Sequence, residues 1–272
     1  MRDMAAEHIV PPLPRSYAGV NWLGFYTLYM KEVRRFAKIP MQTVLAPLMT
    51  SLLYMLVFGV ATKGARPPVG GVPFTEFVAP GLVMMTILNN AFANSSSSIL
   101  QAKMMGLSSD FLTPPLTSIE QSAAFVLGAA TRGIVVGVVT LMAVWPFAHG
   151  HISHVWAAVW FMFAASMIMA QLGVLAGLWS EKFDHMAMIQ NFVVMPMTFL
   201  SGTFYMVDRL PTPFRIASHF NPFFYLIDGF RYGFINVTDG DIAIGTISSL
   251  ALVVGLQVWC WRLFCRGYRL KT

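Results

Sequence analysis

The stretch Val155-Trp-Ala-Ala-Val-Trp-Phe-Met-Phe-Ala-Ala-Ser-Met-Ile-Met-Ala-Gln-Leu-Gly-Val-Leu-Ala-Gly-Leu-Trp-Ser180 decides the fold, because it carries no charged residue over a length that can cross a bilayer. Its apolar residues do not alternate with polar ones as they would in a barrel strand, so it predicts a membrane-spanning helix. The whole chain of 272 residues is 56% hydrophobic and only 11% charged. A soluble domain carries about 25% charged residues, so most of this chain cannot face water.

Five further apolar runs of similar length flank this one. They are Pro40–Ala61, Phe77–Ser97, Ser118–Phe147, Met186–Phe204 and Ile242–Phe264. We therefore expect an all-α membrane protein whose transmembrane domain of six helices covers residues 40–264. A polar, proline-containing tail over residues 1–20 lacks the pattern of a signal peptide, so the first span would also serve as the insertion signal.

Basic residues predict the orientation of the spans. With six spans, one side of the membrane would hold Arg2, Arg15, Lys31, Arg34, Arg35, Lys38, Lys103, Lys182, Arg262, Arg266, Arg269 and Lys271. The other side would hold Lys63, Arg66, Arg209, Arg215 and Arg231. The first set is more than twice as large, so the positive-inside rule places both termini in the cytoplasm. Topology alone would account for the basic tail over residues 265–272.

Residues 21–39 show the pattern of an amphipathic helix. One face collects Trp22, Phe25, Tyr26, Tyr29, Val33 and Phe36. The opposite face collects Lys31, Arg34, Arg35 and Lys38. Such a helix lies in the membrane interface, here on the cytoplasmic leaflet. It is either a general membrane anchor or a docking surface for a cytoplasmic partner.

Two connections between spans carry further information. The cytoplasmic one, about residues 99–115, is half apolar and allows one or two helical turns before Pro114-Pro115, so it either lies on the bilayer or fills a groove of a partner. The outside one, about residues 202–235, is aromatic and interrupted by prolines, which suits short helices that re-enter the outer leaflet. Its charges argue against a seventh span: Asp208, Arg209, Arg215, Asp228 and Arg231.

Motifs in the outside connection resemble the signature of type-2 ATP-binding-cassette (ABC) exporter permeases. The motifs are Gly202-x-Phe204-Tyr205, Leu210-Pro211, Asn221-Pro222-x-x-Tyr225 and Gly229-Phe-Arg231-Tyr-Gly233. Further matches in the same order are Lys31-Glu-x-x-Arg35-Phe36, Pro80-Gly-Leu, Ala102-Lys103, Ala130-x-Arg132-Gly133 and Phe183-Asp184. The resemblance covers nearly the whole chain and is nearest to the bacterial branch of nodulation-factor and capsular-polysaccharide exporters and uncharacterised inner-membrane permeases. It does not specify a substrate.

The resemblance implies a homodimer of six-span subunits in the bacterial inner membrane, each bound to a separate cytoplasmic ABC ATPase, so that two ATPase copies serve the dimer. Residues 21–39 would be the connecting helix, about 99–115 the coupling helix, and Glu181–His185 a smaller contact. The residues expected to couple to the ATPase are Lys31, Arg34, Arg35, Lys103, Met104, Met105, Leu107, Asp110, Phe183 and Asp184. Residues 202–235 would cap the exit path.

Polar residues inside the spans are the candidates for a substrate path or the dimer seam. They are Asn89, Asn90, Asn94, Arg132, Gln171 and Asn191. Each could instead serve structure alone, through hydrogen bonds between helices or, for Arg132, by reaching the cytoplasmic surface. Gly128, Gly133 and Gly137 would allow another helix to approach closely beside Arg132.

The sequence contains no phosphate-binding loop of the type Gly-x-x-x-x-Gly-Lys-Ser/Thr, so the chain is not expected to be an enzyme. ATP and Mg would belong to the partner, with no cofactor, metal or nucleic acid bound here. His149, His151 and His154 are more typical of an exposed turn than of a metal site. The expected substrate is lipid-like, glycan or drug-like. The alternatives, an ion-coupled secondary transporter and a membrane-embedded lipid-modifying enzyme, would normally need carboxylates inside the spans.

Overall fold

The computed structural model describes residues 19–61, 68–107, 114–148 and 152–269. Regular structure in these residues is helical, and the one pairing of extended backbone is an isolated antiparallel bridge between Val69 and Val72. The prediction of an all-α protein is therefore confirmed. Most of the tail over residues 1–20, together with Asp110, His149, His151 and Lys271, lies outside the described residues.

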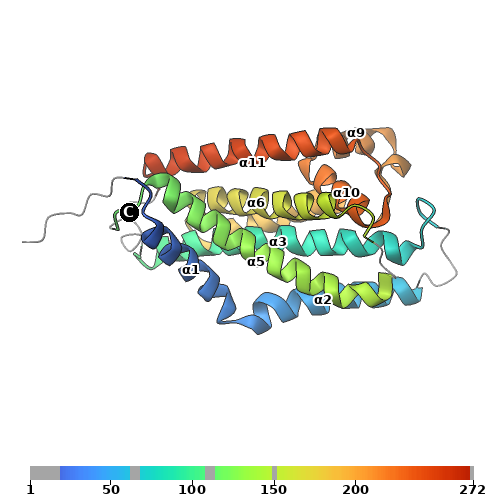
Figure 1. The fold of residues 1–272 in the computed structure, drawn as a ribbon, viewed down its shortest axis with the longest axis horizontal. Helices are drawn as coiled ribbons and strands as arrows, with labels where there is room; N and C mark the ends of the chain where they lie inside the picture. The colour runs from blue at the N-terminus through green and yellow to red at the C-terminus, as the bar shows by residue number, and fades with distance from the viewer. Residues whose placement is uncertain (1–18, 62–67, 108–113, 149–151, 270–272) are drawn as a thin grey trace, which may run out of the picture.

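The helices are named as in Figure 1. The first half of the chain forms α1 Trp22–Ala37, η1 Met41–Leu45, α2 Ala46–Ala61, α3 Phe74–Met104 and α5 Ser118–Ala148. The second half forms α6 Val155–Trp179, α7 Phe183–Ile189, η2 Gln190–Val194, α8 Met195–Leu200, η3 Val207–Arg209, α9 Thr212–Phe220, α10 Pro222–Ile235 and α11 Ile242–Cys265. The segments η1 and η2 are π-helical turns, and η3 is a 3₁₀ turn.

Five helices in the described residues are long and apolar enough to cross a membrane. They are Met41–Gly59, Phe74–Met104, Ser118–Phe147, Val155–Trp179 and Ile242–Cys265. Each coincides with one of the expected spans. The largest difference lies in α3, which starts at Phe74 and continues to Met104, whereas the expected span covered Phe77–Ser97. The serine run lies within this helix, and the hydroxyl groups of Ser95 and Ser96 donate to carbonyls of the preceding turn.

The sixth expected span, Met186–Phe204, is a helical segment of different composition. It consists of α7, η2 and α8 in direct succession, from Phe183 to Leu200. Charged and amide residues at Asp184, Gln190 and Asn191 make it less apolar than the other five, so the count of six spans is not confirmed. Its first residue follows the end of α6, and its last residue accepts a hydrogen bond from Ser218 of α9 at 3.0 Å.

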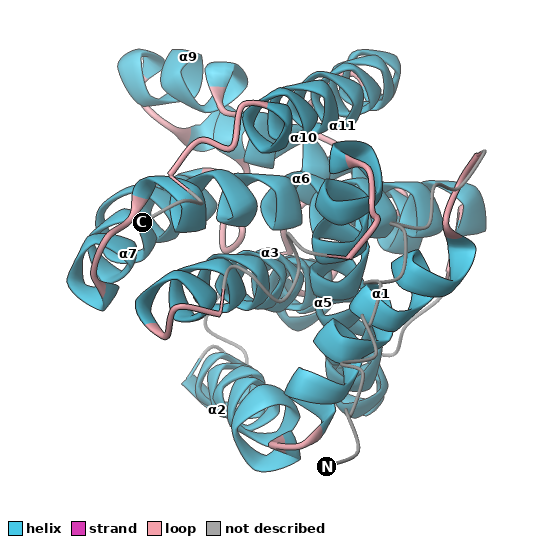
Figure 2. Ribbon diagram, turned by 90° about the vertical axis from the view of Figure 1, so that its left-hand side faces the viewer, coloured by secondary structure: helices cyan, strands magenta, loops and turns pink. Residues whose placement is uncertain are grey.

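The two most buried helices, α3 and α6, form the centre of the bundle, with α5 packed against both. Seen end-on, α2 and α11 lie on opposite sides of them (Figure 2). Close contact between α3 and α6 depends on Gly173 and Gly177: a Cβ atom there would lie 2.5 Å from the carbonyl oxygen of Phe92 and 2.9 Å from that of Ser96. The outward faces of α2 and α11 are apolar and largely exposed, as lipid contact requires.

The bundle has two distinct ends (Figure 1). The described chain begins and finishes at one of them, here called the termini end, which holds α1, the end of α3 and the end of α11. The other, here called the α9–α10 end, carries the two short helices that follow Leu200.

The expected coupling helix over about 99–115 differs from the observed structure. Residues 99–104 form the last turn and a half of α3, and the chain leaves that helix at Gly106, whose φ of +69° only glycine adopts readily. Residues 108–113 lie outside the described residues, so a separate helix there stays a prediction.

Candidate functional site

The helix α1 packs along α5 instead of resting only on a membrane surface. Its first residue is capped by Asn21, which receives a hydrogen bond from Gly24 and donates its own backbone N–H to Glu120 of α5 at 2.7 Å. The buried face of α1 consists of Leu28, Glu32 and Phe36. The expected apolar face is thus only partly buried: Trp22 is 71% exposed and Tyr26 is 57% exposed.

Glu32 lies at the centre of this contact, fully buried. It fits because Gly128 of α5 has no side chain: a Cβ atom at that position would lie 2.5 Å from the Cβ of Glu32. One carboxylate oxygen accepts a hydrogen bond from Ser98 of α3 at 2.8 Å, and the other pairs with Arg35 at 3.2 Å. Burial of a carboxylate is costly without such partners, so these contacts fix the position of α1.

Arg35 extends the network into α3. Its guanidinium donates to the backbone carbonyl of Asn94 at 2.6 Å, to the side-chain oxygen of Asn94 at 2.9 Å and to Ser97 at 3.4 Å. The basic residue that was expected to lie on an outward face is therefore half-buried and turned into the bundle.

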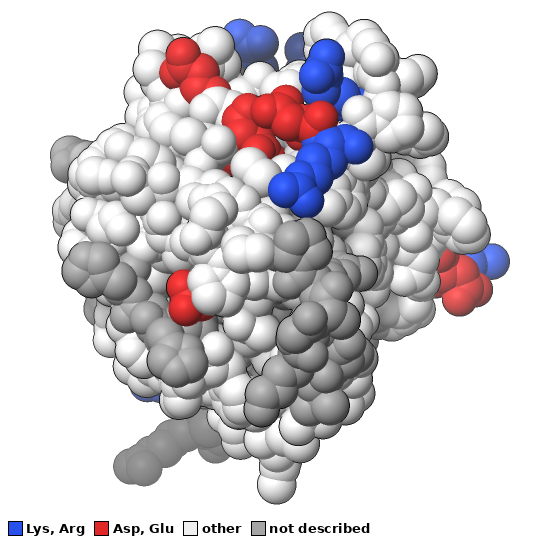
Figure 3. Space-filling model, turned by 90° about the vertical axis from the view of Figure 1, so that its right-hand side faces the viewer, with Lys and Arg blue, Asp and Glu red and all other residues white. Residues whose placement is uncertain are grey.

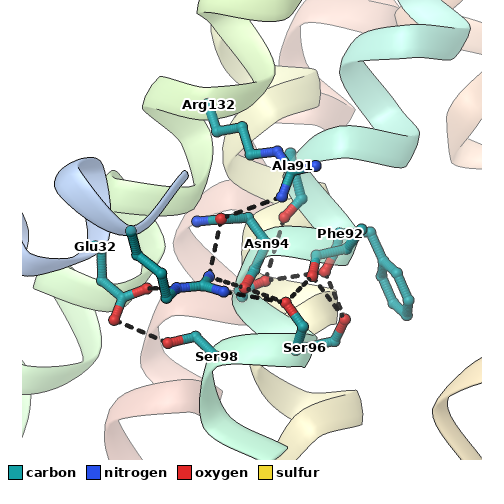
Figure 4. A network of polar contacts seen from close by, with 11 residues as sticks. Glu32, Ala91, Phe92, Asn94, Ser96, Ser98 and Arg132 are labelled. Atoms are coloured by element: carbon teal, nitrogen blue, oxygen red, sulfur yellow. Dashed lines mark hydrogen bonds and ion pairs between the residues drawn. The ribbon is translucent and has the colours of Figure 1, made fainter. Parts of the chain in front are cut away.

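Arg132 of α5 reaches the same asparagine from the opposite direction. Its guanidinium donates to Asn94 at 3.4 Å and to Asn90 at 3.1 Å, as Figure 4 shows for Asn94. Asn89, which the sequence grouped with these residues, is not hydrogen-bonded to Arg132 and instead accepts a hydrogen bond from Gln190 at 3.1 Å. The side-chain oxygen of Asn94 thus links a charged residue of α1 to a charged residue of α5.

The network carries two guanidinium groups against one carboxylate. Two buried polar atoms in it, Nδ2 of Asn94 and Nε of Arg132, have no hydrogen-bond partner among the described residues. Since buried polar groups are usually satisfied, this part of the molecule is suited to a rearrangement or to a polar contact from outside the chain. We call Glu32, Arg35, Asn90, Asn94, Ser98 and Arg132 the α1–α3–α5 network.

A groove adjoins the network on the side of α2. It has a volume of about 200 Å³ and is lined by residues of α2, α3 and α8, among them Tyr54, Asn89, Asn90 and Met195. Asn90 belongs to both features, so the groove and the network share a side chain. Asn191, the next residue after Gln190, is exposed in the middle of the helical segment that borders this groove.

Gln171 is not part of this site. Its amide donates to the backbone of Val253 at 3.0 Å and to Gln257 at 3.2 Å, so it joins α6 to α11. The structure therefore separates Gln171 from the asparagines and Arg132 with which the sequence grouped it.

The expected ATPase-coupling residues that the structure describes lie at the termini end, but two of them, Arg35 and Lys103, face inward. Lys31, Arg34, Phe183 and Asp184 are exposed, and so are the three apolar residues that end α3 and follow it, Met104, Met105 and Leu107. Lys103, by contrast, is buried with 9% exposure, and its ammonium group donates to backbone carbonyls at the end of α6. Lys103 therefore faces its own subunit.

At the α9–α10 end, Asn221 organises the segment that was expected to re-enter the outer leaflet. It caps α10 by accepting from Phe223, and its amide donates to Met197 and Ser201 at 2.7 and 2.8 Å. Pro222 then occupies the first position of α10, where its missing N–H costs nothing. Gly202, with φ of +76°, makes the preceding turn.

Arg231 of α10 is buried with 1% exposure. Its guanidinium lies 3.9 Å from the ring centre of Phe77 in α3, donates to the carbonyl of Gly202 and pairs with Asp228. The other expected residues of this end make separate contacts. Phe204 packs against Phe58 and Phe199, and Tyr205 donates to the carbonyl of Phe199 at 3.1 Å. Pro211 precedes α9, and Tyr225 packs against Phe224. Figure 3 shows acidic and basic side chains gathered close together on this end of the molecule.

A comparison with protein families covers the chain from α1 to the end of α10. The family model described as "ABC-2 type transporter" matches residues 24–235. The chain belongs to the ABC-2 type transporter family. As a member of this family it is a membrane subunit of an ABC transporter, and the resemblance seen in the sequence is confirmed.

Individual relatives agree with the family. The chain is 32% identical to the "Inner membrane transport permease YadH" of Escherichia coli over 255 residues, 92% of this chain and 98% of that protein. It is 24% identical to "Nodulation protein J" of Rhizobium leguminosarum bv. viciae over 219 residues, 78% of this chain and 82% of that protein. It is also 24% identical to "Nodulation protein J" of Sinorhizobium fredii, over 85% of this chain and 87% of that protein.

Glu32 and Ser98 are the site residues that sequence reasoning missed. The spacing of Leu28, Glu32 and Phe36, four residues apart, places the acidic residue between two apolar ones on one helical face. A charge embedded in an apolar face was the available signal for Glu32. Ser98 has no comparable signal because it belongs to a run of four serines. The described residues contain no group of His, Cys, Asp and Glu suited to a metal ion.

Proposed function

We propose that this chain is the permease subunit of an ABC exporter in the bacterial inner membrane, powered by a separate cytoplasmic ATPase. It works as a homodimer with two ATPase copies and moves a lipid-like, glycan or drug-like substrate. The observation that carries the proposal is the α1–α3–α5 network, which ties a helix at the termini end to the groove lined by α2, α3 and α8.

The proposal includes six membrane crossings with the termini end in the cytoplasm. The segment Phe183–Leu200 begins beside the end of α6 and finishes beside α9, so its two ends belong to opposite ends of the bundle. That placement supports a sixth crossing despite the lower hydropathy of this segment. The basic residues of α1, Lys182 before α7, and Arg262, Arg266 and Arg269 at and after the end of α11 belong to segments at the termini end, which supports a cytoplasmic location.

The network gives the ATPase a route into the spans. Because Arg35 and Glu32 are bonded to α3 while Lys31 and Arg34 stay exposed on the same helix, a force on the exposed face of α1 is transmitted to Asn94. Arg132 then responds because it donates to Asn94, and Asn90, which lines the groove, responds because it accepts from Arg132. ATP binding would in this way bias two conformations of the spans.

The groove between α2, α3 and α8 marks the seam that a second copy would cover. Asn191 is exposed in the segment beside it, and an amide in contact with lipid is unfavourable. Contact with the same segment of a second copy would provide a polar partner for it. The substrate would pass along this seam and leave beneath α9 and α10. The names of the relatives, a transport permease and a nodulation protein, support transport without fixing the cargo.

Copurification tests the proposal. The tagged chain, extracted from its own bacterial membrane, is expected to bring down a separate ATPase subunit in equal amount. The reconstituted complex is then compared with Arg35→Gln, which removes the bonds to Asn94, and with Lys38→Gln, which removes an exposed charge from the end of the same helix. We expect Arg35→Gln to keep the ATPase bound and lose transport, and Lys38→Gln to behave like the parent. Absence of any copurified ATPase would favour an ion-coupled transporter.

A further inference from the structure

The end of α6 at the termini end presents a group of backbone carbonyls that need partners. The last carbonyls of a helix have no partner within it. In α6 these are the carbonyls of Gly177, Leu178 and Trp179, followed by that of Ser180 at the C-cap. All four accept hydrogen bonds from cationic side chains of two other parts of the chain.

Lys103, at the end of α3, supplies the first cation. Its Nζ atom lies 2.7 Å from the carbonyl oxygen of Leu178, 2.7 Å from that of Ser180 and 3.3 Å from that of Gly177. These bonds use all three donors of the ammonium group. A positive charge at a helix C-terminus also interacts favourably with the helix dipole.

Arg269, beyond the end of α11, supplies the second cation. Its Nη1 atom donates to the carbonyl of Trp179 at 2.6 Å and lies 3.4 Å from a carboxylate oxygen of Glu181, the first residue of the turn into α7. Thus the turn between α6 and α7 is held on one side by α3 and on the other by the C-terminal turn.

The same kind of helix ending lies beside both cations: Lys103 is the last residue but one of α3, before the ending, and Arg269 follows the ending of α11. At the end of α3, Leu107 donates to Ala102 and Gly106 donates to Lys103; after α11, Tyr268 donates to Leu263 and Gly267 donates to Phe264. This pair of bonds defines a Schellman ending, which requires a residue with positive φ. Gly106 and Gly267 have φ of +69° and +60°. After the ending of α11 the chain brings Arg269 to the carbonyl of Trp179 at the end of α6.

We infer that Lys103 and Arg269 are positioning residues that clamp the end of α3, the α6–α7 turn and the C-terminal turn into one rigid unit. The exposed apolar residues on the two sides of this clamp, Met104 and Met105 after α3 and Phe183 at the start of α7, then form a single surface instead of two loops that move independently. The identity of the ATPase as the partner of that surface rests on the proposed function; the clamp itself does not.

The basic C-terminal turn therefore has a structural role in addition to any role in membrane topology. If its charges only set the orientation of the chain, any one of them would serve as well as another. Arg266 provides the matched control, because it is exposed in the same turn and its side chain has no hydrogen bond or ion pair within the part of the chain that the structure describes. Arg266→Gln and Arg269→Gln remove the same charge from the same segment.

Hydrogen exchange of the isolated chain in lipid nanodiscs tests the clamp without any partner. The variants are Lys103→Met, Lys103→Arg, Arg269→Gln and Arg266→Gln. We expect exchange of the backbone amides in residues 181–187 to become about tenfold faster in Lys103→Met and Arg269→Gln, because local opening there becomes easier. Lys103→Arg, which keeps a cationic donor, and Arg266→Gln are expected to exchange like the parent. Unchanged exchange in both Lys103→Met and Arg269→Gln would overturn the clamp.

The complex with the ATPase tests the consequence. With the clamp released, the ATPase is expected to bind and to hydrolyse ATP, while the amount of substrate moved per ATP falls about fivefold or more, because the two contact sites no longer move together. Met104→Asp with Met105→Asp should instead abolish ATPase binding. Parent-like transport per ATP in Arg269→Gln, with faster exchange, would refute the single surface. Failure to obtain any ATPase partner would refute the proposed function and leave the exchange result valid.

Discussion

The carboxylate of Glu32 accepts a hydrogen bond of 2.8 Å from the hydroxyl group of Ser98, across the contact between α1 and α3. The same carboxylate pairs with Arg35, so one buried group joins two helices and neutralises one guanidinium. A helix that rested only on the membrane surface would need neither contact. The amphipathic helix is therefore built into the bundle at its middle as well as at its first residue.

Replacement of Glu32 by leucine is expected to destabilise the protein by about 3 kcal/mol, because Arg35 and Ser98 lose a buried partner. Glu32→Gln should cost about 1 kcal/mol, since an amide oxygen can still accept from Ser98. Equilibrium unfolding in mixed detergent micelles measures both values. A leucine variant as stable as the parent would contradict the role of this carboxylate.

Gly128→Ala is expected to displace α1 from α5. The added methyl group would lie 2.5 Å from the Cβ of Glu32, an atom fixed to the backbone of α1, so relief requires a shift of the helix costing about 1–3 kcal/mol. Gly255→Ala on α11 is the matched control because nothing lies within 4 Å of its added methyl group. Faster proteolysis within α1 in the first variant alone is the expected result; equal rates in the two variants would speak against it.

Arg132→Leu should leave membrane insertion intact, because it removes an embedded charge that costs about 2.5–3.5 kcal/mol on insertion scales. It should reduce transport about tenfold, because the link from Asn94 to Asn90 is lost. Arg132→Lys should restore part of the activity, since lysine lacks the planar fork of donors. Transport is measured in proteoliposomes with the ATPase bound. Parent-like transport by the leucine variant would make Arg132 a purely structural residue.

Cysteine labelling should place the two ends of the bundle on opposite sides of the membrane. In a background without Cys260 and Cys265, Met105→Cys and Arg209→Cys introduce thiols at two exposed positions. An impermeant thiol reagent added to spheroplasts should label position 209 at once and position 105 only after permeabilisation. The reverse pattern would invert the proposed orientation.

Asp239 should make the α9–α10 end less stable as the pH rises from acidic values toward neutral. Burial raises the pKa of this carboxyl, and Asp228 adds to the effect, whereas the N–H of Val207 and the charge of Arg231 oppose it. The folded state therefore binds the proton more tightly than the unfolded chain. Stability is greatest below the ordinary pKa and decreases until the pH exceeds the raised pKa.

Asp239→Asn removes this dependence while its amide oxygen can still accept from Val207, the donor that now lies 2.8 Å from Oδ2. Thermal unfolding between pH 4 and pH 7 should show a smaller slope for the variant and equal or higher stability at pH 7. A variant that is clearly less stable than the parent at pH 7 would mean that the ionised carboxylate is needed there.

The sequence was sufficient for most of the spans because uninterrupted apolar composition determines them. The expected span that ends at Ser180 coincides with α6 within one residue, and those that begin at Ser118 and Ile242 start where α5 and α11 start. It was insufficient for the segment beginning at Phe183, where amide side chains lower the hydropathy although the helix continues.

The site was only partly predictable for a different reason. Arg132 and Asn94 were visible as polar residues within spans, but the bond from Arg35 to Asn94 depends on how α1 packs. The amphipathic pattern of α1 placed Arg35 on the face opposite the apolar one. The resemblance implied that Lys103 contacts the ATPase. Carbonyls at the end of α6 and at its C-cap, which no local pattern reveals, turn it inward.

The π-helical turns have a consequence for chain length. In η1 the N–H of Ala46 donates to Met41, and in η2 the N–H of Met195 donates to Gln190, each five residues back instead of four. Each turn thus holds one residue more than an α-helix of the same span. Deleting Asn191 would restore ordinary α-helical geometry and leave the downstream residues on their present faces. Relatives that are one residue shorter at this point would therefore superpose on this chain both before and after it.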